Sequence, residues 1–435
     1  MKDRVSANPG RVKLTPEDGS PAFYATMERA DNPTEEGTPL NKSTLLSDAA
    51  CDLLEIPQTS TVNEAFLKLA LGVGKYGYTV HFQWPDGSPM VGYRVSGLTA
   101  IDGSALTTDD TGTVFGVSEN TSVSVSVSTS FQDLNTASKT IRSTGILTED
   151  TVKITRKSSF TLTADSSRSY QFSQWAPLVD ICAVGGGGSG GSASGFSSYS
   201  DTSICAASGG AGGKVNILEN YNPAGKTLTV SIGAGGEGVK NNGVTSPANG
   251  SSGGTTTVKS GTATVLSASG GKGGKAASKI GSGSARAYGA SGGSGSGGCC
   301  AAASSSPSYW ASGAGASGSN GEDGEAGIAE DDDGVAHGSA SGGKGQGTTT
   351  AFNGTTYSAA GGGAAYAFYS GGHEHESETA AGGSGAGAGH VGANGGNATQ
   401  KGAGGGGSVR NRSDPGTSGT SGAGADGRVI IKKAS

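Results

Sequence analysis

Large and charged side chains are scarce in this chain of 435 residues: aromatic residues make up 6% of it, charged residues 15% and apolar residues 33%. Glycine takes their place, with 82 residues. Residues 1–180 hold 13 of these and residues 181–435 hold 69, or 7% and 27% of the two parts. The second part therefore has too few large side chains to offset its chain entropy with an ordinary apolar core. It also lacks the high net charge of disordered chains.

Further absences exclude whole classes of protein. The net charge is −6, and residues 181–435 carry 15 basic and 15 acidic residues without a basic cluster, which argues against nucleic-acid binding. No apolar run approaches the roughly 20 residues that span a bilayer, so membrane insertion is not expected. The N-terminus, MKDRVSANPGRVKLTP, lacks the apolar segment of a secretory signal. We expect a chain that is made and folded in a cytoplasm.

The cysteines do not indicate a disulfide scaffold, because their number is odd and they are widely spaced (Cys51, Cys182, Cys205, Cys299 and Cys300). We expect the adjacent Cys299 and Cys300 to be a pair of small reduced side chains; a strained vicinal disulfide is the alternative.

Residues 1–75 predict an extended arm followed by two short helices. Five prolines punctuate residues 1–40, which we expect to be ordered only on a partner. Asn41 can cap the first helix. Thr61–Glu64 forms a capping box for the second, and Gly72 ends it. Helices of about 12 residues are marginal alone, so we expect them to pack on each other or on sister chains.

Residues 76–157 predict a small β-sandwich that serves as a spacer. Apolar and polar residues alternate there, as in Ser122–Val127, and turn signals such as Pro85–Pro89 and Asp109–Gly112 separate the alternating stretches. The order of turns and strands is similar to the transthyretin-like or carboxypeptidase-regulatory-like sandwiches. This resemblance implies a mount without chemistry of its own.

Residues 158–435 predict a folded glycine-rich domain. A flexible linker would have no reason to contain short apolar stretches, but several interrupt the glycine here. They are Leu178–Val184, Lys214–Leu218, Thr227–Ile232, Ala263–Leu266 and Arg428–Ile431. The glycine spacing is irregular, which excludes a collagen triple helix.

We expect the glycine runs to form packed polyglycine II rods, a left-handed conformation with three residues per turn and no internal hydrogen bonds. Their amides must find partners on neighbouring rods, which approach closely because no Cβ separates them. The fold class is thus mainly β with polyglycine II. The alternative is a disordered low-complexity tail.

The ordered motifs of this domain resemble the glycine-rich domain of bacteriophage tail fibres and adhesins. They are, in chain order, Val179–Gly188, Gly212–Val215, Leu228–Gly236, Ser269–Gly274 and Gly424–Lys432. Pro9–Pro16 and Glu35–Lys42 resemble the leader of tail fibre proteins in phages and prophages of Gram-positive gut bacteria. The resemblance implies an N-terminal segment that attaches to tail or baseplate proteins, a spacer, and a distal domain whose loops bind a bacterial surface glycan or protein.

Large side chains isolated among small ones are the candidate receptor contacts, because Tyr and Trp offer broad contact area at low entropic cost. The alternative is that they form local mini-cores at the ends of the rods. The candidates are Phe196, Tyr199, Tyr309, Trp310, Phe352, Tyr357, Tyr366, Phe368 and Tyr369.

His373 and His375 are the best metal candidates, since residues two apart share one face of a strand. A solvated polar loop is the alternative, and no other cofactor is indicated. No nucleophile with a base and an orienting group is recognisable, so we do not expect an enzyme.

The sequence thus predicts a virion tail fibre adhesin. A homo-oligomer is expected, and three chains are common in fibres, although no long heptad repeat is visible. Two alternatives remain, namely a purely structural fibre or decoration protein and a polysaccharide-degrading tail spike.

Overall fold

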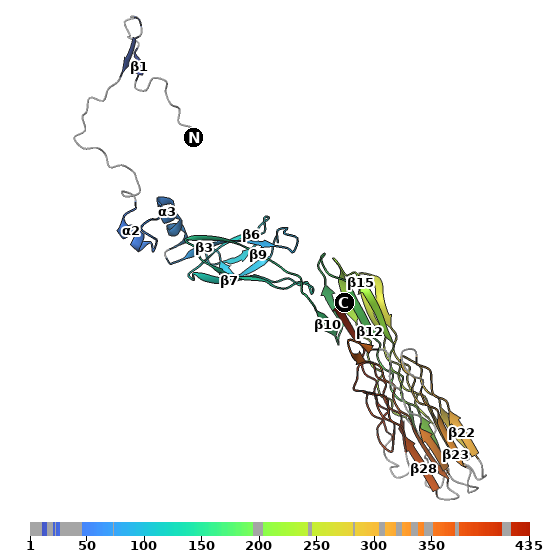
Figure 1. Cartoon of the computed structure of the whole chain (residues 1–435). Helices are drawn as coiled ribbons and strands as arrows, with labels where there is room; N and C mark the ends of the chain where they lie inside the picture. The colour runs from blue at the N-terminus through green and yellow to red at the C-terminus, as the bar shows by residue number, and fades with distance from the viewer. Residues whose placement is uncertain are drawn as a thin grey trace. The chain divides into compact units, whose positions relative to one another are not determined.

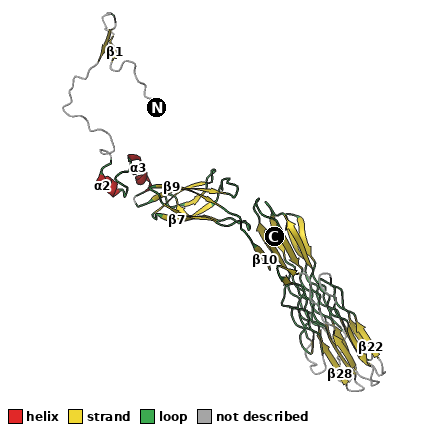
Figure 2. Ribbon diagram, in the orientation of Figure 1, coloured by secondary structure: helices red, strands yellow, loops and turns green. Residues whose placement is uncertain are grey.

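The structure is a computed structural model that describes residues 11–14, 21, 23–26, 46–72, 74–194, 203–241, 246–281, 283–303, 309–318, 324–331, 338–342, 351–369, 374–410 and 419–435. The described residues are mainly β, with two short helices (Figure 2). The chain divides into two compact units. One comprises Met1–His81, Arg94–Val125 and Lys139–Thr151, and the other comprises Phe82–Tyr93, Ser126–Ser138 and Val152–Ser435.

The first elements are a hairpin of β1 (Arg11–Leu14) and β2 (Phe23–Thr26), followed by α2 (Asp48–Leu53) and α3 (Val62–Leu71). The predicted capping box is confirmed: the Thr61 hydroxyl accepts from the Glu64 amide, and the Glu64 carboxylate accepts from the Thr61 amide. Gly72 ends α3 with φ 95°, as predicted. Ser47 caps α2, and Asn41 lies outside the described residues.

The two helices pack on each other, as expected, through a cluster of Leu46, Cys51, Leu54, Ile56 and Ala65. No helix in the described part of the chain is long and apolar enough to cross a membrane.

The predicted alternation in residues 76–157 is confirmed by burial. In Ser122–Val127, for example, the three valines are buried. The strands form one seven-stranded sheet in the order β8-β7-β4-β6-β3-β9, with β5 paired to β4. Their bounds are β3 Tyr76–Gln83, β4 Arg94–Thr99, β5 Ala105–Thr107, β6 Thr113–Ser118, β7 Ser122–Val127, β8 Ala137–Arg142 and β9 Leu147–Lys153.

The apolar stretches embedded in the glycine-rich sequence form strands, as predicted. One sheet has the order β10-β31-β12-β15 and a second has the order β11-β16-β17-β18. They share an apolar core that includes Phe172, Ile181, Leu228 and Ile431. The bounds are β10 Thr161–Ala164, β11 Arg168–Gln171, β12 Val179–Val184, β15 Val215–Tyr221, β16 Thr227–Ser231, β17 Thr256–Ser260, β18 Ala263–Ala268 and β31 Arg428–Lys433.

An ion pair joins the two ends of the glycine-rich sequence at this core. Arg428, the first residue of β31, donates from Nε to Asp165 Oδ1 at 2.7 Å and from its terminal nitrogen to Oδ2 at 2.9 Å. Asp165 follows β10, so the contact spans almost the whole domain in sequence. The hydrogen bond from Arg428 lowers the pKa of Asp165 below its usual value.

The other end of the second unit is a stack of sheets whose core consists of small side chains. Strands in the orders β19-β14-β27-β28 and β20-β21-β24 pack through alanine and cysteine residues together with Ile204, and β22 pairs with β23. The bounds are β14 Ser203–Ala207, β19 Ala276–Ile280, β20 Gly283–Ala287, β21 Cys299–Ala303, β22 Tyr309–Gly313, β23 Gly327–Asp331, β24 Gly338–Gly342, β27 Ala364–Tyr369 and β28 Glu374–Thr379.

Short strands complete the second unit. β13 (Ser192–Ala193), β29 (His390–Val391) and β30 (Ser408–Val409) form a parallel sheet, and β25 (Ala351–Phe352) pairs with β26 (Thr355–Thr356). All five cysteines are buried and none forms a disulfide, which also holds for the adjacent Cys299 and Cys300.

Glycine-rich segments, drawn mostly as loops in Figure 2, join the two groups of strands and bond to one another through their backbones. The central segment, residues 185–191, is wholly buried. Its amides donate with a period of three: residues 185, 188 and 191 donate to segment 208–214, residues 186 and 189 to segment 248–254, and residues 187 and 190 to segment 422–425, over 2.9 to 3.1 Å.

The carbonyls of the same segment accept from three further places. Those of residues 186 and 189 accept from segment 271–274, those of residues 188 and 191 accept from segment 405–408, and that of Gly187 accepts from Gly236. Six neighbours thus surround one glycine segment, and the backbone itself forms the interior of the domain.

This packing leaves no room for side chains at the glycine positions. A Cβ at Gly187 would lie 1.9 Å from the carbonyl oxygen of Ala403, and one at Gly190 would lie 2.0 Å from that of Gly406. Ser189 is the exception in the segment, and its hydroxyl accepts from the Ser251 amide at 2.8 Å. Backbone atoms cannot move aside as a rotamer can, so glycine is required at these points.

We predict that Gly187→Ala lowers the free energy of unfolding of the second unit by about 1–3 kcal/mol or more, because overpacking here displaces backbone. Gly145→Ala is the control, since a Cβ at Gly145 meets nothing within 4 Å and should change stability by no more than about 0.5 kcal/mol. Chemical denaturation of the full chain measures both values. Equal stability of the two variants would contradict the packing described here.

Candidate functional site

Strand ends from three sheets gather at one end of the second unit. Ser203 begins β14 and pairs with Ile280 and Phe368, near the ends of β19 and β27. Ala303 ends β21 and pairs with the first residues of β20 and β24, while Tyr309 begins β22 opposite the last residue of β23. The end that carries β22, β23 and β28 lies opposite the end that carries β10, β15 and the C-terminus (Figure 1). We call the former the distal end.

Four of the predicted receptor contacts lie on strands at the distal end. Tyr309 and Trp310 are the first two residues of β22, and Phe368 and Tyr369 are the last two of β27. Phe196 and Tyr199 lie outside the described residues, in the segment that precedes β14 in sequence. The structure thus brings two of the aromatic pairs to one end of the unit.

Three other predicted contacts are core residues, which corrects their assignment as receptor contacts. Phe352, Tyr357 and Tyr366 are only 6%, 4% and 1% exposed. Phe352 and Tyr357 pack with Cys182, Val184, Val215 and Ile430, and Tyr366 belongs to a separate cluster with Cys205 and Val409. These three rings are therefore part of local cores, which was the alternative to receptor contact.

A tight turn explains the inward position of Phe352. Asn353 and Gly354 have φ values of 53° and 75°, and they join β25 to β26 as a two-residue hairpin of the kind that Asn-Gly favours. Lys432 Nζ, on the neighbouring β31, lies 5.2 Å from the centre of the Phe352 ring. The hairpin is therefore held against the β12–β31 sheet.

The predicted metal pair is only partly described. His375 lies on β28, where it pairs with Phe368 of β27, and His373 lies outside the described residues. Within the described part of the chain, no group of three or more His, Cys, Asp or Glu side chains is arranged to hold a metal ion. The metal assignment stays a prediction.

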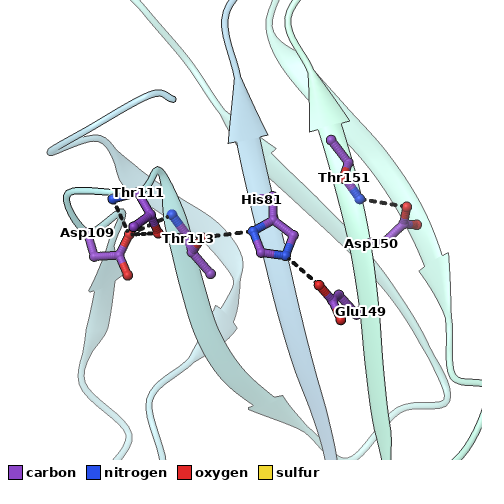
Figure 3. A network of polar contacts seen from close by, with 7 residues as sticks. All are labelled: His81, Asp109, Thr111, Thr113, Glu149, Asp150 and Thr151. Atoms are coloured by element: carbon purple, nitrogen blue, oxygen red, sulfur yellow. Dashed lines mark hydrogen bonds and ion pairs between the residues drawn. The ribbon is translucent and has the colours of Figure 1, made fainter. Parts of the chain in front are cut away.

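A polar network in the first unit has a form that the sequence did not suggest. His81 of β3 lies between Thr113 of β6 and Glu149 of β9 (Figure 3). Its Nδ1 is 2.8 Å from Thr113 Oγ1, and its Nε2 is 2.8 Å from Glu149 Oε1. A hydroxyl, an imidazole and a carboxylate in this order resemble a nucleophile, a base and its orienting group.

The surroundings of Thr113 favour a structural role for this network. Thr111 Oγ1 lies 2.8 Å from Thr113 Oγ1 and 2.7 Å from Asp109 Oδ1, so the Thr113 hydroxyl is engaged on both sides. Hydrogen bonds from the Thr113 amide and from Thr111 lower the pKa of Asp109. The contacts join the 109–113 turn to three adjacent strands. Sequence patterns miss this network because Thr113 and Glu149 are 32 and 68 residues from His81.

Comparison with known proteins identifies the second part of the chain. Residues 162–434, well over half of the chain, match the family described as "Glycine-rich domain". No curated protein matches the chain.

We predict that Tyr357→Ala lowers the free energy of unfolding by about 3–5 kcal/mol, because it removes a buried ring. Tyr288→Ala is a matched control, since Tyr288 is 54% exposed and its loss should change stability by no more than about 0.5 kcal/mol. Guanidinium denaturation distinguishes the two. A stable Tyr357→Ala protein with a selective loss of cell binding would return Tyr357 to the set of receptor contacts.

Proposed function

We propose that this chain, which belongs to the glycine-rich domain family, is an adhesin of a bacteriophage or prophage tail fibre. Residues 1–75 would attach it to tail or baseplate proteins, and the glycine-rich domain would bind a glycan or protein on the bacterial surface. The observation that carries the proposal is the gathering of strand ends, with two aromatic pairs, at the distal end of a tightly bonded domain. Binding is noncovalent and involves no catalysis.

The glycine-rich segments act in this proposal as polyglycine II rods. A helix with three residues per turn directs every third amide to the same neighbour, and the amides of residues 185–191 follow this period. The central segment is bonded to six neighbours, so in this proposal the scaffold resists bending better than a single sheet would. Such a scaffold holds binding residues in place and tolerates changes in the loops it carries.

Tyr309, Trp310, Phe368 and Tyr369 are the residues to which we assign receptor contact, with Phe196 and Tyr199 from the segment that leads into β14. Tyr and Trp rings provide large contact areas with few rotatable bonds, which suits a surface that must bind without folding around its ligand. Fibres carry several copies of their adhesins, so weak contacts at each copy add through avidity. We therefore propose a homo-oligomer on the virion, as is common for fibres.

We predict that replacing Tyr309, Trp310, Phe368 and Tyr369 with serine in the full chain reduces binding to host cells at least about tenfold, because hot-spot aromatics carry most interface energy. Tyr288→Ser is the control. The Tyr288 ring is exposed, and it follows the last residue of β20, whereas the first residue of that strand, Gly283, lies at the distal end. Flow cytometry of the labelled protein on a panel of bacterial strains measures binding.

Host-range exchange distinguishes the adhesin from a purely structural fibre protein. Residues 185–426 are replaced with those of a related phage that infects another host. A changed host range is expected, whereas an unchanged range would favour the structural alternative. Release of sugar from purified capsule by the protein would instead favour a depolymerase spike.

A further inference from the structure

An aromatic hollow lies in the second unit, where the segments that follow β3 and β7 meet the segments that follow β11 and β15. Trp84, Phe131 and Trp175 line it together with the exposed Gln174 and with Gly225, and its volume is about 330 Å³. The three rings are half-buried, so each is supported by protein on one side and reaches the hollow on the other. This volume lies at the lower end of the range of about 300–1,000 Å³ that small-molecule sites occupy.

The rings form one cluster around Trp84. Its ring centre lies 5.2 Å from that of Trp175 at an interplanar angle of 37°, and 6.0 Å from that of Phe131 at 62°. Tyr93 packs edge-on against Trp84 at 5.3 Å. A ligand cannot enter between rings at these distances, so it would lie on the outer side of the cluster.

Backbone and side-chain hydrogen bonds fix the segments that carry Phe131 and Trp175. Gln132 donates to the Gln171 carbonyl at 2.9 Å, and Gly225 donates to the Ser173 carbonyl at 2.9 Å. The buried Asp133 carboxylate accepts from the Ser173 amide at 2.9 Å and from its hydroxyl at 2.5 Å. Trp175 in turn donates from its amide to the Ser173 hydroxyl at 3.1 Å. The hollow is therefore preorganised by partners behind it.

The polar groups near the rings select the class of ligand. Asp86, two residues after Trp84, is exposed, and its Oδ1 accepts from the Ser88 amide at 3.0 Å and from the Ser88 hydroxyl at 2.6 Å. These bonds and, to a lesser extent, the Trp175 side chain lower the pKa of the Asp86 carboxyl. The Gln174 amide is also exposed. None of the lining residues is charged. The neighbouring Lys226 directs its Nζ to the Asn222 carbonyl at 2.8 Å and over the Tyr221 ring at 4.8 Å. A carboxylate and an amide suit hydroxyl groups, and the carboxylate disfavours an anion.

We propose that this hollow binds a neutral saccharide unit, stacked on the Trp84–Trp175–Phe131 cluster and hydrogen-bonded through its hydroxyls to Asp86 and Gln174. The C–H face of a sugar ring is weakly positive and apolar, and it complements the negative face of an aromatic ring. The site is separate from the distal end. It would give the chain a second, sugar-directed contact whether or not the distal end binds a receptor.

The full chain with Trp310→Phe is the protein for the test, because Trp84 and Trp175 are then its only tryptophans. The protein is first applied to an array of neutral mono- and oligosaccharides. Its tryptophan fluorescence is then titrated with glucose, galactose, rhamnose and N-acetylglucosamine, and with tetramethylammonium chloride. We expect array binding and a saturable fluorescence change with a neutral sugar, at a dissociation constant on the order of 1 mM, as is usual for a small ligand with few contacts.

Two variants in this background locate the site. Gly225→Asn places a side chain where a Cβ meets nothing within 4 Å, at a φ of 68° that Asn tolerates, and it should weaken sugar binding at least about tenfold by filling the hollow. Gly261→Asn, at a φ of 58° and equally open, is the matched control and should keep the affinity within about twofold. Gln174→Ala, on an exposed side chain, should weaken binding several-fold without affecting folding.

Three results would overturn the proposal. They are the absence of any signal on the array and in the titrations, equal sugar affinity in Gly225→Asn and Gly261→Asn, and saturable binding of tetramethylammonium without binding of any neutral sugar. Cell binding is not the readout, so failure here leaves the proposed adhesive function untouched, and loss of cell binding in the serine variants leaves this site untouched.

Discussion

Direct hydrogen bonding between backbones that carry no Cβ is the constraint on which this protein depends. In an ordinary core, side chains separate the backbones of adjacent layers and apolar burial drives folding. Residues 185–191 instead have six backbone neighbours: all seven amides donate to them in a period of three, and the carbonyls of residues 186–189 and 191 accept from them. Glycine is entropically costly to order, and only a dense set of lateral bonds, with no buried amide left unpaired, offsets that cost.

The two ends of the glycine lattice differ in the size of their side chains. At one end, rings and branched chains such as Phe172, Ile181 and Leu228 form a conventional core between two sheets. Toward the distal end, alanines pack between the sheets together with Cys299 and Ile204. The lattice joins the two mainly through backbone bonds, to which a few serine side chains such as Ser189 contribute. In the proposed function, this arrangement holds the distal residues still while their neighbours vary.

The sequence predicted the elements that depend on local patterns. The capping box at Thr61, the strands β12, β15, β16, β18 and β31, and the alternation in Ser122–Val127 all follow from period or spacing. Whether an isolated ring is buried or exposed could not be predicted, because the sequence around it consists of small residues in both cases. The Asn353-Gly354 turn was the available signal for Phe352. The His81 network and the Trp84 hollow join distant segments, which spacing along the chain cannot reveal.

Amide hydrogen exchange of the full chain tests the central claim most directly. If the backbone lattice is the interior of the domain, the amides of residues 186–191 should exchange orders of magnitude more slowly than in a free peptide, through cooperative opening of the whole second unit. The amide of Gly92, in an exposed turn, serves as the internal reference. Exchange of residues 186–191 at free-peptide rates would contradict the account.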